Sequence, residues 1–176
     1  MRKLGFLAGL LIALALPAAA QEPVEFPTVE LFSGFSYANL DFDLKRRNFV
    51  GFQGNLSVNL YENLGITGDV GGQFKSLPGL SIQTWEFLIG PRAAVRGNRL
   101  TVFGHALFGA MHTRIRQIGS ATDFAMGFGG GADVNLSKNL ALRVLQVDYI
   151  PVSSGGIWLH NLRFGFGIVI KAGGGY

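Results

Sequence analysis

NLRFGFGIVIK, residues 161–171, is a stretch in which large apolar side chains alternate with small or polar ones. The apolar positions are Leu162, Phe164, Phe166, Ile168 and Ile170. The positions between them are Asn161, Arg163, Gly165, Gly167, Val169 and Lys171, of which only Val169 is apolar. Successive side chains of a β-strand point to opposite faces. The stretch is therefore predicted to be a strand with one apolar face and one small or polar face.

The same alternation occurs in seven stretches that precede it. They are predicted to be strands at residues 29–40, 48–60, 64–74, 84–95, 100–113, 123–135 and 140–149. In the fifth, the favoured orientation places His105 inward, and Phe103, Leu107 and Met111 then point inward too. In the seventh, Arg143 fits one parity whereas Gln146 and Asp148 fit the other. A β-bulge, which inserts one extra residue near Leu145, would place all three charged or polar residues on one face.

The predicted connections alternate in length. Those after the second, fourth and sixth strands have three or four residues, and the others are predicted to be loops of seven to eleven residues. The predicted strands, of about ten to thirteen residues, would cross the roughly 25 Å apolar band of an outer membrane. The pattern therefore predicts an all-β fold, an eight-stranded antiparallel up-and-down transmembrane β-barrel. Such a barrel has no sheet edge with unpaired backbone groups in the lipid.

Alternation alone does not say which face is wet, because a soluble barrel with an apolar lumen has the same period. The polar positions here are mostly Gly, Asn, Ser and Gln, and glycine accounts for 26 of 176 residues. Small side chains suit the narrow lumen of an eight-stranded barrel. Aromatic residues near the predicted strand ends suit interfacial girdles. These are Tyr37, Tyr61, Phe74, Trp85, Tyr149 and Trp158. The apolar faces are therefore predicted to meet lipid.

The N-terminal residues predict export. Residues 1–20 begin with Arg2 and Lys3, continue with an apolar core and end in three alanines, as a cleaved signal peptide does. A retained anchor is the alternative, but the apolar core is short for one. The expected organisation is a signal peptide at 1–20, a periplasmic lead-in at 21–28, a barrel at 29–171 and a tail at 172–176. Removing two of 15 basic residues leaves 13 against 11 acidic ones, which does not suggest a nucleic-acid partner.

Charged residues at inward positions are the main candidate site. They are Glu30, Asp69, Glu86, Arg92, Asp133, Arg143, Asp148 and Arg163. A charge in a narrow lumen is costly unless it is paired. One hypothesis is a set of salt bridges that plugs and stiffens the barrel, and the other is a gate whose pairs rearrange to pass small ions. The chain has no cysteine, and nothing in its sequence predicts a metal or a cofactor.

The chain resembles the OmpA-like, eight-stranded outer membrane β-barrel family of Gram-negative bacteria. The resemblance rests on VELFSGFSYANL at 29–40, FLIGPRAAV at 87–95, FGGGADVNLSKNLALRVLQVDY at 128–149 and the final strand. It implies a location in the outer membrane and leaves the activity open. The expected role is that of a non-enzymatic structural or surface-interaction protein. The expected partners are outer membrane lipids and lipopolysaccharide, and the expected state is a monomer. A narrow pore for ions or small solutes is the alternative. The final strand is also similar to the signal that the barrel-assembly machinery reads, here Arg163, Gly165, Ile168 and Ile170, although the chain ends in AGGGY.

Two further hypotheses concern the outer surface. The basic residues Lys45, Arg46, Arg47, Arg114 and Arg116 would either be ordinary solvated charges or contact lipopolysaccharide phosphates, which arginine suits. Some barrels of this size are lipid A-modifying enzymes, and a deacylase would need histidine, serine and a carboxylate near the bilayer surface. The candidate pairs are His160 with Ser153 or Ser154, and His112 with Ser120. None has a diagnostic spacing, so no catalytic residue is predicted.

Overall fold

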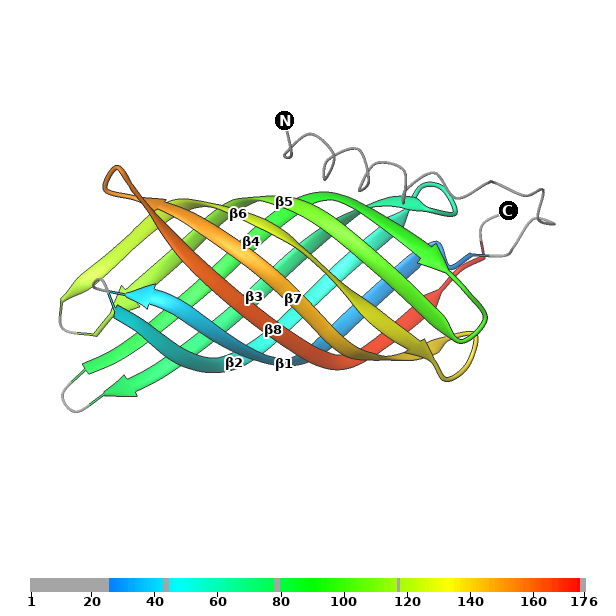
Figure 1. Cartoon of the computed structure of the whole chain (residues 1–176), viewed down its shortest axis with the longest axis horizontal. Helices are drawn as coiled ribbons and strands as arrows, with labels where there is room; N and C mark the ends of the chain where they lie inside the picture. The colour runs from blue at the N-terminus through cyan, green and yellow to red at the C-terminus, as the bar shows by residue number, and fades with distance from the viewer. Residues whose placement is uncertain (1–25, 43–44, 78–79, 117, 175–176) are drawn as a thin grey trace, which may run out of the picture.

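Eight antiparallel strands form a closed barrel in the computed structural model (Figure 1), which describes residues 26–42, 45–77, 80–116 and 118–174. The strands are β1 Val29–Phe42, β2 Lys45–Asn59, β3 Leu64–Leu77, β4 Leu80–Arg96, β5 Leu100–Ile115, β6 Gly119–Asn135, β7 Leu140–Ser154 and β8 Ile157–Ala172. Each strand pairs with its neighbours in sequence, and β1 pairs with β8. The predicted fold class is confirmed. The predicted signal peptide lies outside the described residues, and the part of the chain that is described contains no helix long and apolar enough to cross a membrane.

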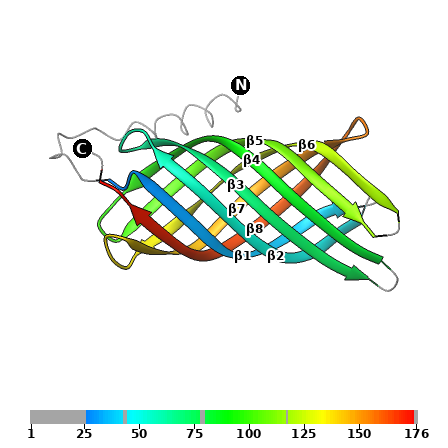
Figure 2. The ribbon, with the colours of Figure 1, turned by 180° about the vertical axis from the view of Figure 1, so that it is seen from behind.

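The pairing of β1 with β8 closes the barrel. β8 contains the alternating stretch that most clearly predicts this fold. The ladder runs from Val29 opposite Ala172 to Asn39 opposite Leu162. Figure 2 shows the barrel from behind, with tilted strands covering that side as well. Every backbone edge of the sheet therefore has a neighbour, which a bilayer requires because it offers no water to unpaired groups.

The predicted alternation of faces is present around the barrel. In β8, Phe166, Ile168 and Ile170 are exposed on the outside, whereas Arg163 and Val169 are buried in the lumen. The register favoured for β5 is also present, because Phe103, Leu107 and Met111 are buried inside. The lumen is thus not uniformly polar.

The predicted bulge in β7 is confirmed. The register of β7 against β8 shifts between Arg143 and Gln146. The two residues between them, Val144 and Leu145, are both exposed on the outside. The extra residue brings Arg143, Gln146 and, further along, Asp148 into the lumen.

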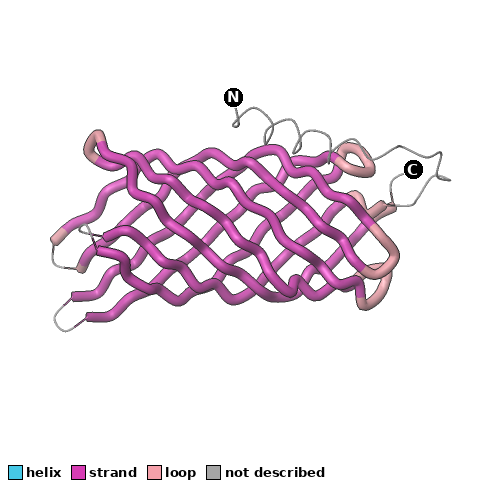
Figure 3. The backbone as a smooth tube through the Cα atoms, in the orientation of Figure 1, coloured by secondary structure: helices cyan, strands magenta, loops and turns pink. Residues whose placement is uncertain are grey.

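The predicted long loops are wrong. Strands have 14 to 17 residues, and residues 43–44, 78–79, 116–118 and 155–156 are all that separate the strands at one end. We call this the distal end, and the other, where Val29 and Ala172 lie, the terminal end (Figure 3). In the charged stretch at 41–48, residues 41–42 and 45–48 pair as strand, with Asp41 opposite Arg46. Charges argue against a strand only where it faces lipid. Beyond the apolar band, water solvates the side chains while the ladder continues.

Candidate functional site

The lumen at the terminal end is crossed by a salt bridge cluster around Glu30. Its carboxylate lies 2.8 Å from Arg92 Nη2 and 2.9 Å from Arg96 Nη2. Asn59 on β2 donates a further hydrogen bond of 3.1 Å to Glu30 Oε1. The first inward residue of β1 is thereby tied to β2 and β4.

Arg143 occupies the next level of the lumen. It donates two hydrogen bonds to Asp133, of 2.7 and 3.0 Å, in the bidentate geometry that makes arginine–carboxylate pairs strong. Its guanidinium also lies 4.2 Å from the ring centres of both Phe32 and Phe103. Such cation–π contacts strengthen when they are desolvated. They explain why two phenylalanines point into a lumen that is otherwise charged at this level.

Arg163 is the centre of the largest cluster. Its guanidinium lies 2.8 Å from Asp69, 2.6 Å from Glu86 and 2.8 Å from Asp148, and all four side chains are at most 1 % exposed. The three carboxylates come from β3, β4 and β7. His105 Nε2 lies 2.8 Å from Asp148. The guanidinium of Arg163, on β8, therefore links β3, β4 and β7 across the lumen.

Gln146 joins the Arg143 and Arg163 clusters. It accepts a 2.7 Å hydrogen bond from Arg143 Nη1 and donates one of 2.8 Å to Asp148 Oδ2. A continuous chain of polar contacts therefore runs from Asp133 to Glu86. We call this chain, with the Glu30 cluster beside it, the lumen network.

Sequence parity placed its eight candidate charges inside the barrel, and the structure buries and pairs all eight. Sequence parity did not indicate the roles of four further residues in the lumen. These are the salt bridge of Arg96 to Glu30, the hydrogen bond of Gln53 to Asp69, the link through Gln146, and the hydrogen bond of Lys171 to Asn135. The sequence predicts a turn at Arg96, but this residue continues the inward alternation of β4 after Arg92. Gln53 donates to Asp69, a contact that no local pattern indicates.

One glycine makes room for this network. A Cβ atom added at Gly71 would lie 2.8 Å from both Arg163 Nη1 and Glu86 Oε2, so Gly71→Ala must displace the ion pair. We expect the free energy of unfolding, measured by urea titration in lipid vesicles, to fall by about 1–3 kcal/mol. The control is Gly68→Ala on the same strand, where an added Cβ meets nothing within 4 Å. Its effect should stay within about 0.5 kcal/mol or be slightly stabilising. Equal losses in the two variants would contradict this role of Gly71.

The five basic candidates do not form one surface. Arg46 is exposed on β2 and donates to Asn39, whereas its neighbour Arg47 pairs opposite the inward Leu40. Lys45 begins β2, but its side chain lies outside the described part. Arg114 is on β5 and Arg116 lies in the turn that follows it, so both are separated from β2 by β3 and β4.

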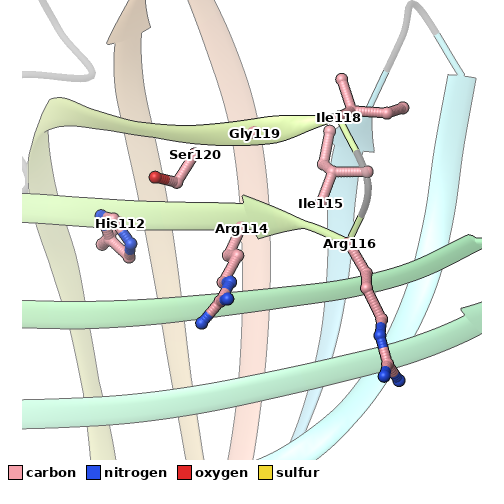
Figure 4. A pocket seen from close by; sticks show the side chains of 7 residues that line it. All are labelled: His112, Arg114, Ile115, Arg116, Ile118, Gly119 and Ser120. Atoms are coloured by element: carbon pink, nitrogen blue, oxygen red, sulfur yellow. The ribbon is translucent and has the colours of Figure 1, made fainter.

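Arg114 and Arg116 together form a basic surface at the distal end. They line a cavity of about 260 Å³ with Ser81 and Gln83 of β4. On their other side, His112 and Ser120 line an adjoining hollow (Figure 4). Figure 4 shows the side chains of Arg114, on β5, and Arg116, in the turn after it, extending the same way. Two arginine side chains thereby line the same hollow of the outer surface.

The histidine–serine pairs considered for catalysis are not hydrogen-bonded within the described residues. His112 Nδ1 lies 2.8 Å from Thr122 Oγ1, and His160 contacts the hydroxyl of Tyr149. The described residues also contain no group of three or more His, Asp and Glu side chains able to hold a metal. The geometry therefore offers no assembled triad in this part of the chain.

The four residues of the predicted assembly signal occupy two faces of β8. Arg163 and Gly165 are in the lumen, and Ile168 and Ile170 are exposed outside. Their recognition by the barrel-assembly machinery stays a prediction.

The sequence and the closed eight-stranded fold both resemble those of known proteins. The family model described as outer membrane protein beta-barrel domain matches residues 6–169. The chain belongs to this family. It is a small outer membrane β-barrel. A comparison with curated proteins gives no match.

Several solved structures share this fold. Neisserial surface protein A, NspA, superposes with a TM-score of 0.71 at 9% identity, over 82% of this chain and 97% of that one. Ail of Yersinia pestis gives 0.59 at 14% identity, over 84% and 100%. OprG of Pseudomonas aeruginosa gives 0.57 at 9% identity, over 84% and 96%. At these identities the likeness shows the fold alone.

Proposed function

We propose that this protein is a non-enzymatic, closed outer membrane barrel whose role is structural or lies in contacts made by its outer surface. The observation that carries the proposal is the lumen network, which connects Asp133 to Glu86 through buried side chains. Residues from all eight strands contribute to it, because the Glu30 cluster adds β1 and β2. Export through a cleaved signal peptide and a monomeric state are part of the same proposal.

The energetics favour a plug over a gate. Five buried carboxylates face four arginines and Lys171 in the lumen, so the charges balance. Removing one partner of a buried pair leaves an uncompensated charge and costs about 3–5 kcal/mol. Rearranging these pairs to let an ion through would carry a similar penalty. A narrow pore is the alternative, and it needs that penalty to be offset by water or by the passing ion.

Conductance distinguishes the plug from the pore. We expect the purified protein in planar bilayers to show no unitary current steps, because the Arg163 and Arg143 clusters cross the lumen at two levels. Arg92→Ala should also stay silent, since it leaves both of these clusters intact. A large-pore porin in the same bilayer provides the positive control. Discrete steps from the wild type whose size changes in Arg92→Ala would support the pore instead.

We also propose that Arg114 and Arg116 contact the phosphates of lipopolysaccharide in the outer leaflet. Arg114 stands opposite Gln83, and the next outward positions of β4 toward the middle of the barrel are Trp85, opposite His112, and then the exposed Phe87. This order places cations where phosphates are expected and apolar groups where acyl chains are expected. Ail of Yersinia pestis has been crystallised with sucrose octasulfate, a heparin analogue, so another barrel of this fold has been seen with a polyanion.

Paired variants test this contact. Arg114→Gln with Arg116→Gln is expected to lower the amount of co-purifying lipopolysaccharide several-fold, because two charge-assisted hydrogen bonds are lost. Arg46→Gln removes one exposed cation from β2, away from this surface, and is expected to change it little. Lipopolysaccharide is quantified per barrel by mass spectrometry after identical detergent washes. If the double variant retains as much lipopolysaccharide as the wild type, the two arginines are ordinary solvated charges and the proposed contact is wrong.

A further inference from the structure

The lumen ends at the distal end in a cavity that the lumen network does not fill. Its volume is about 240 Å³, and its lining residues lie near the distal ends of the strands. Six of its described lining residues are apolar: Leu40, Met111, Ile115, Ala121, Val152 and Leu159. We call this cavity the vestibule. Apolar side chains facing an opening to water are unusual unless they meet a partner or a ligand.

The vestibule is a blind pocket. Met111 and Val152 belong to a buried cluster that also contains Leu88, Leu107 and Ile150, and this cluster forms the wall toward the centre of the barrel. Two residues beyond Asn161, which lines the vestibule, Arg163 begins the lumen network. A molecule that enters from outside is therefore held there and does not pass through.

Asn161 holds the shape of the pocket. It donates a 3.0 Å hydrogen bond to the carbonyl of Ile150 and accepts one of 2.8 Å from the backbone N–H of Asp41. These two bonds tie β8 to β7 and to β1 at the level of the vestibule. The cavity is thus preformed, which lowers the cost of ordering on binding.

The charge of the vestibule is negative. Asp123 lies opposite Met111 on β6 and lines the cavity, and Asp41 lines it too. Among the described lining residues there is no lysine, arginine or histidine. Asp123 also has no salt bridge to any described residue. This carboxylate differs from those of the lumen network, each of which faces a cation.

We propose that the vestibule binds a small aliphatic amine, with its alkyl chain against the apolar wall and its ammonium group at Asp123. A volume of about 240 Å³ lies below the roughly 300–1,000 Å³ of pockets for drug-sized ligands, so the occupant is small. A carboxylate beside apolar walls favours an alkyl ammonium over an alcohol of the same length and disfavours a carboxylate. This site is inside the barrel mouth and is independent of the outer surface at Arg114 and Arg116.

The methionines provide a built-in probe. Met111 lines the vestibule, whereas Met126 is on the outward face of β6 between Phe124 and Phe128. Methyl-¹³C-methionine spectra of the protein in lipid nanodiscs are recorded during titrations with octylamine, octanol and octanoate. We expect octylamine to shift the Met111 methyl signal saturably, with an affinity about tenfold above that of octanol, as one charge-assisted hydrogen bond gives. Met126 reports partitioning of each compound into the bilayer.

Two variants separate the charge from the cavity. Asp123→Asn should reduce the affinity for octylamine to that for octanol. Ala121→Phe, which fills the vestibule, should abolish the saturable shift of Met111, and folding of both variants is checked by heat-modifiable migration on a gel. The proposal is overturned if Met111 and Met126 shift together without saturation, if octanoate binds as well as octylamine, or if folded Asp123→Asn keeps the preference for the amine.

Discussion

Replacing Arg163 by methionine is expected to lower the free energy of unfolding by about 3–5 kcal/mol, the cost of removing one partner from a buried ion pair. The variant leaves Asp69, Glu86 and Asp148 facing one another at most 1 % exposed. Methionine preserves much of the volume, so lost charge compensation dominates over lost packing. Urea unfolding in lipid vesicles, followed by tryptophan fluorescence, measures the change.

Two controls identify the cause of that loss. Arg46→Met removes an exposed arginine of β2 and should change stability by no more than about 0.5 kcal/mol. Adding Glu86→Gln and Asp148→Asn to Arg163→Met should recover part of the loss, because neutral amides do not repel one another. If Arg163→Met were no more harmful than Arg46→Met, the cluster would have little role in holding β3, β4, β7 and β8 together.

Phe166→Lys is expected to have the second large effect, about 2–4 kcal/mol, the cost of a lysine near the middle of a bilayer. Phe166 is 59% exposed and occupies the centre of the outward apolar row of β8. It stacks on Phe35 of β1, with ring centres 6.0 Å apart. The loss should appear as reduced folding yield in vesicles and as a lower unfolding midpoint.

His160→Lys is the matched control for depth. His160 is on the same face of the same strand but near the distal end, where we expect a cost of about 0–1 kcal/mol. A similar cost at both positions would mean that Phe166 does not face hydrocarbon. The apolar exterior would then need another explanation, such as a protein partner.

The sequence predicted the barrel well because its rule is local. Side-chain direction in a strand depends only on parity, so the final strand, the inward Phe103 and the bulge before Gln146 could all be predicted from neighbouring residues. The strand ends could not. Their charge predicts a loop at Asp41 and Arg46, although the two residues pair across the hairpin beyond the apolar band.

The candidate site divides in the same way. Parity indicated which charges are inside, but not which atoms meet. Arg163 and Glu86 are 77 residues apart in sequence, and only closure of the barrel brings them to 2.6 Å. The separation of Arg46 from Arg114 likewise follows from the positions of β2 and β5 around the barrel.

By itself, then, the sequence determined the strand number, the lipid-facing side and the inward position of the charges, because each depends on contacts between near neighbours and on the composition of one face. Only the tertiary structure decided the partners of Arg163, the link through Gln146 and the apolar vestibule beside Asp123. These features depend on distances across the lumen, which the curvature and stagger of the closed sheet set.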